Sequence, residues 1–524
     1  MSDITQEYKE IAEKGKRGIF HLIFGRTLVI LLLLLAQFFL LFHFSFSFVQ
    51  YLPYTYSGIL AFTAAMMLWI LNSPENPSFK LSWCAVIAIL PLFGALLYCF
   101  IRFDLGHRLE QSLLQSTIQK SLVHMPDSSS VLSQVRTQDK ALYNLATYTQ
   151  TQGGYPIFQN TQVTYFPLGE KKFDAMLEQL ERAEHFIFLE YFAIDESYMW
   201  SSILSVLQRK AAQGVEVRVI YDGTSSIANL PYGYPNQLKK MGIQCVEFSP
   251  IRPFVSTHYN NRDHRKILVI DGHTAFTGGV NLDDRYINRV EVFGHWKDTA
   301  VMLQGEAAKG FTFMFLQMWN SLTRGDCYQP YLDVSIPHSA SSTGYVIPYS
   351  DSPLDDESVG KMVYLNILNR ATDYVYIMTP YLILDQEMSS ALRFAARRGI
   401  DVRLILPHIP DKKYAFALAQ SHYKELLDAG VKVYEYTPGF VHAKVFLSDD
   451  LHGVVGTINL DYRSLYLNFE CAAYLYDVPA LKDIHQDFHD TLTKCQRITP
   501  EDIRHRSLLS KLAGILLKVA APLM

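Results

Sequence analysis

One pattern, HxKxxxxD, occurs twice in this chain: as His264-Arg265-Lys266-Ile267-Leu268-Val269-Ile270-Asp271 and as His442-Ala443-Lys444-Val445-Phe446-Leu447-Ser448-Asp449. The similarity continues in register beyond each copy, because Gly278, Asn281, Leu282, Asp283 and Arg285 recur as Gly456, Asn459, Leu460, Asp461 and Arg463. A repeat of this size predicts two similar lobes. Two His-Lys pairs that face each other across the interface between the lobes would make one site.

The segments around the motifs alternate between apolar, β-branched runs and helical patterns. The predicted elements are helix 173–182, strand 185–191, helix 201–213 and strand 215–221 in the first half, and strand 373–378, helix 387–398, strand 402–406, helix 414–429 and strand 431–436 in the second. Alternation of this kind predicts an α/β sandwich in each lobe. We assign the first lobe to residues 146–335 and the second to residues 336–500.

The N-terminal region, residues 1–101, has the composition of a membrane segment. No Asp, Glu, Lys or Arg occurs from Thr27 to Pro74 or from Leu81 to Ile101. Uncharged apolar runs of at least ~18 residues predict membrane-spanning helices, and the tyrosines within residues 51–58 suit a membrane interface. The sequence therefore predicts transmembrane segments at about 28–49, 54–71 and 81–101.

This pattern predicts a multi-pass protein of the cell membrane. Lysines and arginines precede the first segment, so its N-terminus is expected in the cytoplasm. Three full crossings would put the lobes outside, whereas an incomplete second segment would keep them inside, and we favour the cytoplasmic side. Residues 102–145 are predicted to be a polar, helical linker. In the amphipathic tail, residues 501–524, the apolar side chains follow helical spacing, which fits a core helix and a membrane-interface helix equally.

Charge and cysteine usage exclude some classes of function. The formal net charge is −4, so the chain has no global basic field for nucleic acid. None of the six cysteines has CxxC spacing, so we predict neither a disulfide framework nor a zinc site. A homodimer is left open.

The residue types of the motifs suit phosphodiester chemistry. On a strand, the His and Lys of HxK point to the same face. Lys266 and Lys444 supply positive charge for phosphate oxygens, and the amides of Asn281 and Asn459 can add hydrogen-bond donors. One imidazole can attack phosphorus while the other protonates the leaving alkoxide, so no metal or nucleotide cofactor is required. Asp271 and Asp449 complete the motif at a strand end, where a structural role is expected more than a chemical one.

The two motifs, with residues 261–272, Thr277–Asn281, Val441–Lys444 and Gly456–Asp461 around them, resemble the phospholipase D superfamily. Together with the apolar N-terminal segments they are similar to bacterial cardiolipin synthases. The resemblance implies that two phosphatidylglycerol molecules at a bilayer give cardiolipin and glycerol through a phosphohistidine. It assigns His264 as nucleophile and His442 as general acid and base, although the symmetry allows the reverse.

The resemblance also implies an acidic residue behind each histidine, located downstream along the chain. Asp298 and Glu470 occupy that place. A carboxylate on the far ring nitrogen would fix the tautomer and stabilise the imidazolium.

Two other readings compete with cardiolipin synthesis. The first is a phospholipase D hydrolase, or a phosphatidyltransferase that uses another alcohol. The second is a membrane scaffold with a decayed site, which the intact motifs and asparagines argue against.

Overall fold

A computed structural model describes scattered residues between Leu32 and Ser47, and then residues 56–102, 105–250, 261–336, 342–355 and 357–523. The predicted segment 28–49 therefore lies mostly outside the described residues. The N-terminal region forms α3 (Tyr56–Leu71), α4 (Pro77–Ile89) and α5 (Pro91–Arg102). Of the helices within the described ranges, none combines the length and apolar character that crossing a bilayer requires.

The structure divides the predicted segment 81–101 between α4 and α5. Pro91 opens α5 directly after Leu90, and proline cannot continue a helix because it lacks the N–H and crowds the preceding turn. The two helices then pack closely, since a Cβ added at Gly94 would lie 3.0 Å from the Ile87 backbone. Ile70, Ile87, Ala95 and Tyr98 form the small core of this region.

Each lobe contains a mixed β-sheet, and the strand order of the second sheet repeats that of the first, with β18 added at one edge. The first runs β1 (Thr161–Phe166), β9 (Ala300–Gly305), β7 (Thr274–Gly278), β6 (Lys266–Ile270), β2 (Phe186–Tyr191), β3 (Glu216–Asp222) and β4 (Gln244–Phe248). The second runs β10 (Tyr345–Asp351), β17 (Asn468–Tyr476), β16 (His452–Gly456), β15 (Val445–Ser448), β11 (Tyr374–Met378), β12 (Asp401–Pro407), β13 (Lys432–Tyr436) and β18 (Cys495–Arg497). The predicted repeat of α/β lobes is thus confirmed.

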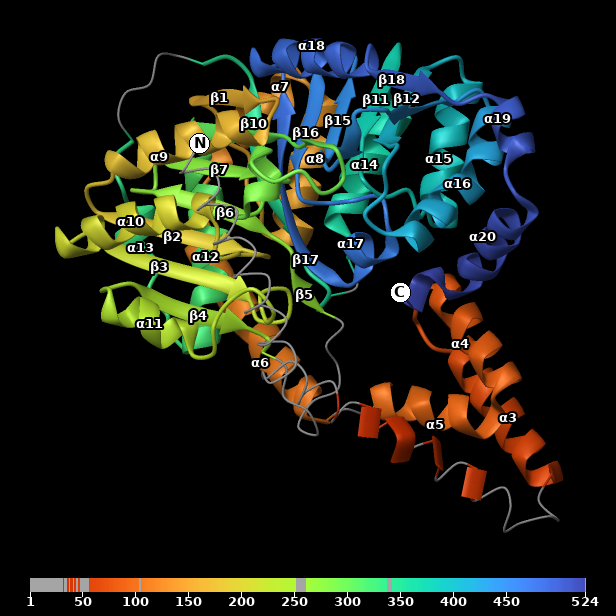
Figure 1. The fold of residues 1–524 in the computed structure, drawn as a ribbon. Coiled ribbons are helices and arrows are strands. Elements are labelled where there is room, and N and C mark those ends of the chain that lie inside the picture. The colour runs from red at the N-terminus through yellow and green to blue at the C-terminus, as the bar shows by residue number, and fades with distance from the viewer. Residues whose placement is uncertain are drawn as a thin grey trace, which may run out of the picture.

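Helices lie against both sheets (Figure 1). The first lobe carries α9 (Gly169–Glu181), α10 (Tyr198–Ala212), α11 (Tyr234–Lys240), α12 (Ala308–Thr323) and α13 (Gln329–Leu332). The second carries α14 (Val359–Arg370), α15 (Gln386–Arg397), α16 (Lys413–Asp428), α17 (Tyr462–Tyr466) and α18 (Ala480–Leu492). Most of α12 is buried, because it packs on β2 and β6 of its own lobe and on β10 of the other.

The linker and the tail are helical. The linker holds α6 (Leu105–Ser121), α7 (Ser129–Gln138) and α8 (Lys140–Tyr148). It packs firmly, since α6 lies on α12 and Leu142 and Leu145 belong to the main hydrophobic core. The tail holds α19 (Pro500–His505) and α20 (Leu508–Ala520), and α20 packs on α16.

Two short strands tie the lobes together at the motifs. Strand β5 (Arg262–Asp263) leaves the first lobe and pairs in parallel with β17 of the second. Strand β14 (Gly439–Val441) of the second lobe pairs in parallel with β8 (His295–Lys297) of the first. Each HxK sequence therefore begins directly after a strand that is held by the opposite lobe.

Candidate active site

The motif histidines are fixed across the interface between the lobes. The His264 N–H donates to the Phe469 carbonyl at 2.9 Å, and the His442 N–H donates to the Lys297 carbonyl at 2.7 Å. The sequence predicts that each HxK lies within a strand. In the structure only Lys266 does, because β5 and β14 end before the histidines and β6 and β15 begin after them.

The carboxylates behind the histidines are exchanged between the lobes. The Glu470 carboxylate lies 2.8 Å from His264 Nδ1, and Asp298 Oδ2 lies 2.7 Å from His442 Nδ1. Chain order pairs each acid with the histidine upstream in its own lobe, and the structure reverses this pairing. The cause is the strand exchange, since β17 brings Glu470 beside β5 and β8 brings Asp298 beside β14.

Both carboxylates are completely buried and are held by further contacts. Thr457 Oγ1 donates to Glu470 Oε2 at 2.5 Å, and the Thr299 N–H donates to Asp298 Oδ1 at 2.8 Å. Gly279 occupies the repeat position of Thr457, and a Cβ there would lie only 2.0 Å from Asp298 Oδ1. The first lobe thus needs a glycine where the second uses a hydroxyl donor.

The two motif lysines are buried beside the histidines. Lys266 Nζ donates to the His264 carbonyl at 2.7 Å. Lys444 Nζ donates to the His442 carbonyl and lies 2.9 Å from His442 Nδ1. Besides burial, the charge of Lys444 lowers the pKa of His264, and that of Lys266 lowers the pKa of His442. Together with the exchanged strands and carboxylates, this brings the four side chains into one site.

Burial sets the protonation of these four groups. It lowers the pKa of His264 to about 4, although Glu470 opposes it, and burial with Lys444 lowers the pKa of His442 to about 3. Burial also lowers the pKa of Lys266 to about 8 and that of Lys444 to about 7. At neutral pH both imidazoles are therefore neutral. An anion in the site would offset the positive charge and raise all four pKa values.

This arrangement predicts that the four side chains of the site take up protons when an anionic phosphodiester binds. All four pKa values lie below their usual ranges in the free enzyme, and an anion moves each upward, so the bound state holds more protons. At pH 7.5 we expect an uptake of about one proton per site. Calorimetric titration with a non-reactive short-chain phosphonate, in buffers of different ionisation enthalpy, measures it.

The matched comparison is the variant Lys444→Met, which removes the lysine with the lower pKa. Its proton uptake should be smaller at pH 7.5. The affinity of the unaltered enzyme should weaken as pH rises above about 7, because the coupled protons become scarce. Proton release on binding, or an affinity that rises with pH, would contradict the charge balance.

The predicted phosphate-binding asparagines occupy equivalent buried positions. Asn281 Nδ2 donates to the Tyr286 hydroxyl at 2.7 Å, and Asn459 Nδ2 donates to Ser464 Oγ at 3.1 Å. Each bond uses one of the two N–H groups of the amide. The second N–H can serve a phosphate oxygen.

Sequence reasoning missed a pair of donors that fix the loops carrying these asparagines. Lys172 Nζ donates to the Val280 carbonyl at 3.2 Å, and the Tyr364 hydroxyl donates to the Ile458 carbonyl at 3.0 Å. Both side chains are completely buried, and both acceptors directly precede an asparagine of the site. The sequence feature that could have indicated Lys172 is its position, as a charged residue, on the apolar face of α9.

The aspartates that end the motifs act on the backbone. The Asp271 carboxylate accepts from the N–H groups of Glu184, His185 and Phe186. The Asp449 carboxylate accepts from those of Thr372, Asp373 and Tyr374. Both residues have positive φ, so the strand ends there in a turn. These contacts fit the structural role expected for them.

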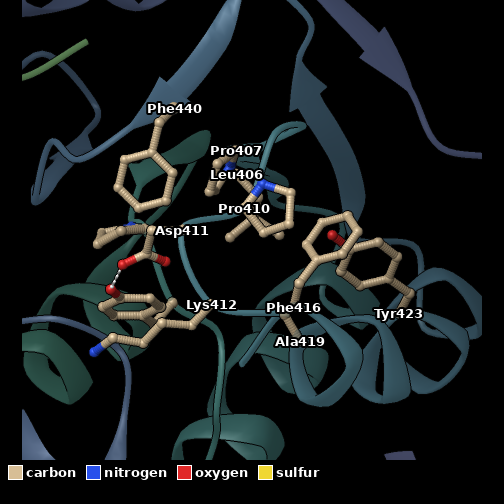
Figure 2. A pocket seen from close by; sticks show the side chains of 11 residues that line it. Leu406, Pro407, Pro410, Asp411, Lys412, Phe416, Ala419, Tyr423 and Phe440 are labelled. Atoms are coloured by element: carbon tan, nitrogen blue, oxygen red, sulfur yellow. Dashed lines mark hydrogen bonds between the residues drawn. The ribbon is translucent and has the colours of Figure 1, made fainter. Parts of the chain in front are cut away.

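Aromatic rings surround the histidines unequally. The Phe192 ring lies 4.8 Å from the His264 ring, whereas Trp296, Tyr286 and Phe440 lie 5.3, 5.4 and 5.9 Å from the His442 ring. Figure 2 shows a pocket next to Phe440, lined by the end of β12 (Leu406 and Pro407), by residues 410–412 of the loop that follows, and by α16. Its volume of about 10 Å³ accommodates roughly one water molecule.

The described part of the chain holds no group of three or more His, Cys, Asp or Glu side chains arranged to bind a metal ion.

Comparisons with known proteins cover most of the chain. The family described as "Cardiolipin synthase, PLD-like domain" matches residues 176–319 and 364–492, and the family described as "Phospholipase_D-nuclease N-terminal" matches residues 59–102. Cardiolipin synthase 2 of Bacillus anthracis is 32% identical over 89% of this chain and 90% of its own length. The cardiolipin synthase of Geobacillus kaustophilus is 32% identical over 89% of this chain and 93% of its own length.

A solved structure supports the fold. The crystal structure of phosphatidylserine synthase from Haemophilus influenzae aligns with a TM-score of 0.56 at 14% sequence identity. The alignment covers 74% of this chain and 99% of that one. At this identity the likeness concerns the fold alone.

Proposed function

The chain belongs to the cardiolipin synthases of the phospholipase D superfamily, and from this premise we propose that it transfers a phosphatidyl group between two phosphatidylglycerol molecules, giving cardiolipin and glycerol. The observation that carries the mechanism is the pair of buried histidines, each with its Nδ1 against a carboxylate of the other lobe. A carboxylate on Nδ1 holds the proton there and leaves Nε2 free to act.

In the first half-reaction, His264 Nε2 attacks the phosphorus of one phosphatidylglycerol. The bond from phosphorus to the glycerol oxygen breaks, and His442 donates its Nε2 proton to that oxygen. Burial and the charges of the two lysines lower the pKa of His442 in the free protein. The bound phosphate offsets the lysine charges and raises this pKa, so His442 carries the proton in the complex. Lys266, Lys444 and the asparagine amides bind the phosphate oxygens.

In the second half-reaction, His442 is neutral and accepts the proton of the second lipid's glycerol hydroxyl. The resulting alkoxide attacks phosphorus, the bond from phosphorus to His264 breaks, and cardiolipin forms. The proton is then back on His442, so the cycle needs no external acid or base. Glu470 stabilises the charge that His264 bears while it is bonded to phosphorus.

Burial favours transfer over hydrolysis. His264 and His442 are only 8% and 7% exposed, and aromatic rings lie against both. A site closed in this way keeps water from the phosphohistidine. The acceptor is then the alcohol that binding brings in.

We also propose that the N-terminal region anchors the chain in the cell membrane, with the lobes on the cytoplasmic side. Support comes from the uncharged run Thr27–Pro74, from the basic residues that precede it, and from the match of residues 59–102 to the N-terminal family. Anchoring places the lipid acceptor at high local concentration.

Product analysis tests the function directly. With phosphatidylglycerol as the sole lipid, we expect cardiolipin and free glycerol in near-equal amounts and little phosphatidic acid, because the closed site admits a lipid hydroxyl in preference to water. Mass spectrometry of the lipids and an enzymatic glycerol assay measure the three products.

The control is the same incubation with added serine or ethanol. A new phosphatidyl alcohol as the main product would show a transferase with another acceptor. Phosphatidic acid as the main product would show a hydrolase, and the proposed function would then be wrong.

A further inference from the structure

One face of helix α20 packs against the second lobe. Gly514 packs so closely on α16 that an added Cβ would lie 3.1 Å from Ser421 Cβ. Leu517, and Ala521 directly after the helix, join a small apolar cluster with Leu418 and Tyr462 of the second lobe. One side of α20 is therefore docked on the catalytic part of the chain.

The outer face of α20 is also apolar, and it is exposed. The exposed fractions of Leu508, Leu512, Ile515, Leu516 and Val519 are 82%, 61%, 63%, 67% and 51%. These residues recur at helical spacing and form one stripe. A helix with apolar residues on two sides is normally buried on both. Exposed apolar surface of this kind marks a binding surface.

The charges around the stripe suit an anionic lipid surface. Residues 503–524 contain Arg504, Arg506, Lys511 and Lys518 and no Asp or Glu, and of these Arg506 is engaged by the protein, since it donates to the Gln420 carbonyl of α16. Lys518 is exposed, and Lys511 donates to the Arg504 carbonyl at 2.9 Å from within the same basic segment. Basic residues beside an apolar stripe are typical of helices that lie in the bilayer interface.

The C-terminal end of α20 also contacts helix α4 of the N-terminal region. Ser82 Oγ of α4 donates to the Val519 carbonyl at 2.6 Å, and the neighbouring Leu81 is 65% exposed. Ile89, at the other end of α4, is 77% exposed. Figure 1 shows the C-terminal end of α20 meeting α4. Helix α4 belongs to the region that matches the N-terminal family.

We propose that the outer face of α20 lies in the interface of an anionic phospholipid bilayer and, together with α4, holds the second lobe against the membrane. This deepens the proposed function and rests on it in taking membrane phospholipid as substrate. The contact reaches the site, because the Phe79 ring of α4 packs edge-on against Tyr462 and Tyr466 of α17. Helix α17 begins at Tyr462, shortly after Asn459.

A fluorophore on the full chain tests the location of α20. The chain carries Cys327→Ser, because Cys327 is an exposed cysteine, and is reconstituted into phosphatidylglycerol vesicles. Leu516→Cys carries the label, and Val123→Cys, at a site 83% exposed on the linker, carries it in the control. Lipids brominated in their acyl chains should quench the label at 516 at least about fivefold more than the label at 123. Aqueous iodide should show the opposite order.

The outcomes separate this proposal from the proposed function. Quenching needs no turnover, so a chain that made phosphatidic acid would still give the expected result. Iodide quenching at 516 equal to that at 123 would overturn the proposal. So would energy transfer between labels at 516 without lipid quenching, since a second copy of the chain would then cover the face.

A second variant links the face to catalysis. Leu512→Gln with Leu516→Gln should lower the rate on vesicles about tenfold and leave the rate on detergent-dispersed lipid unchanged, since only bilayer contact is lost. Val123→Gln is the control and should change neither rate. Equal loss in detergent would contradict a membrane contact, provided that the melting temperature is unchanged.

Discussion

Replacing either His264 or His442 with alanine is expected to lower turnover by on the order of 10⁴-fold, and replacing both should add little. The reason is geometric. Each imidazole lies against a carboxylate of the opposite lobe, and each is affected by the lysine of the other, so the two operate as one unit. Radiolabelled phosphatidylglycerol and product counting cover this range. More than a few per cent activity in either variant would contradict the two-histidine mechanism.

His408 offers a matched control. Its Nδ1 lies 2.9 Å from Glu435, so it forms the same kind of imidazole–carboxylate pair outside the site. His408→Ala removes such a pair and should keep most of the activity. A loss there as large as at His264 would show that general destabilisation, measured as a fall in melting temperature, explains the effect.

The repeat and the pattern of apolar residues allowed much of the fold to be predicted from the sequence. The predicted strands 185–191 and 373–378 correspond to β2 and β11, and the helices 201–213 and 414–429 correspond to α10 and α16, with boundaries shifted by a few residues. Period and composition determine such elements locally, so one chain suffices to find them. The helices of the N-terminal region were harder to predict, since hydropathy alone does not indicate that Pro91 divides the segment 81–101 into two helices.

The pairing of acids with histidines required the tertiary structure. Chain order places Asp298 after His264 and Glu470 after His442, and no local signal indicates that β5 and β14 leave their own lobes. Lys172 shows the same limit, because its role depends on the carbonyl of Val280, far away along the chain. Residue types and register are local information, whereas strand exchange is a property of the assembled lobes.

The exchanged carboxylates predict different defects for Asp298→Asn and Glu470→Gln. On phosphatidylglycerol each should lose about 10²–10⁴-fold in turnover, because an amide does not stabilise the imidazolium. A phosphatidyl ester of 4-nitrophenol separates them, since its leaving group needs no proton. On this ester Asp298→Asn, which impairs His442, should release nitrophenolate in a burst near the unaltered rate and accumulate phosphohistidine on His264. Glu470→Gln, which impairs His264, should show a slow first step and no accumulation.

Thr457→Val, which removes the 2.5 Å hydrogen bond to Glu470, should resemble Glu470→Gln with a loss of only about tenfold, and Thr457→Ser should restore activity. Stopped-flow absorbance and intact-protein mass spectrometry measure both steps. If Glu470→Gln gives the burst and Asp298→Asn does not, His442 is the nucleophile and the roles are reversed. If neither variant separates the steps, the carboxylates do not act through individual histidines.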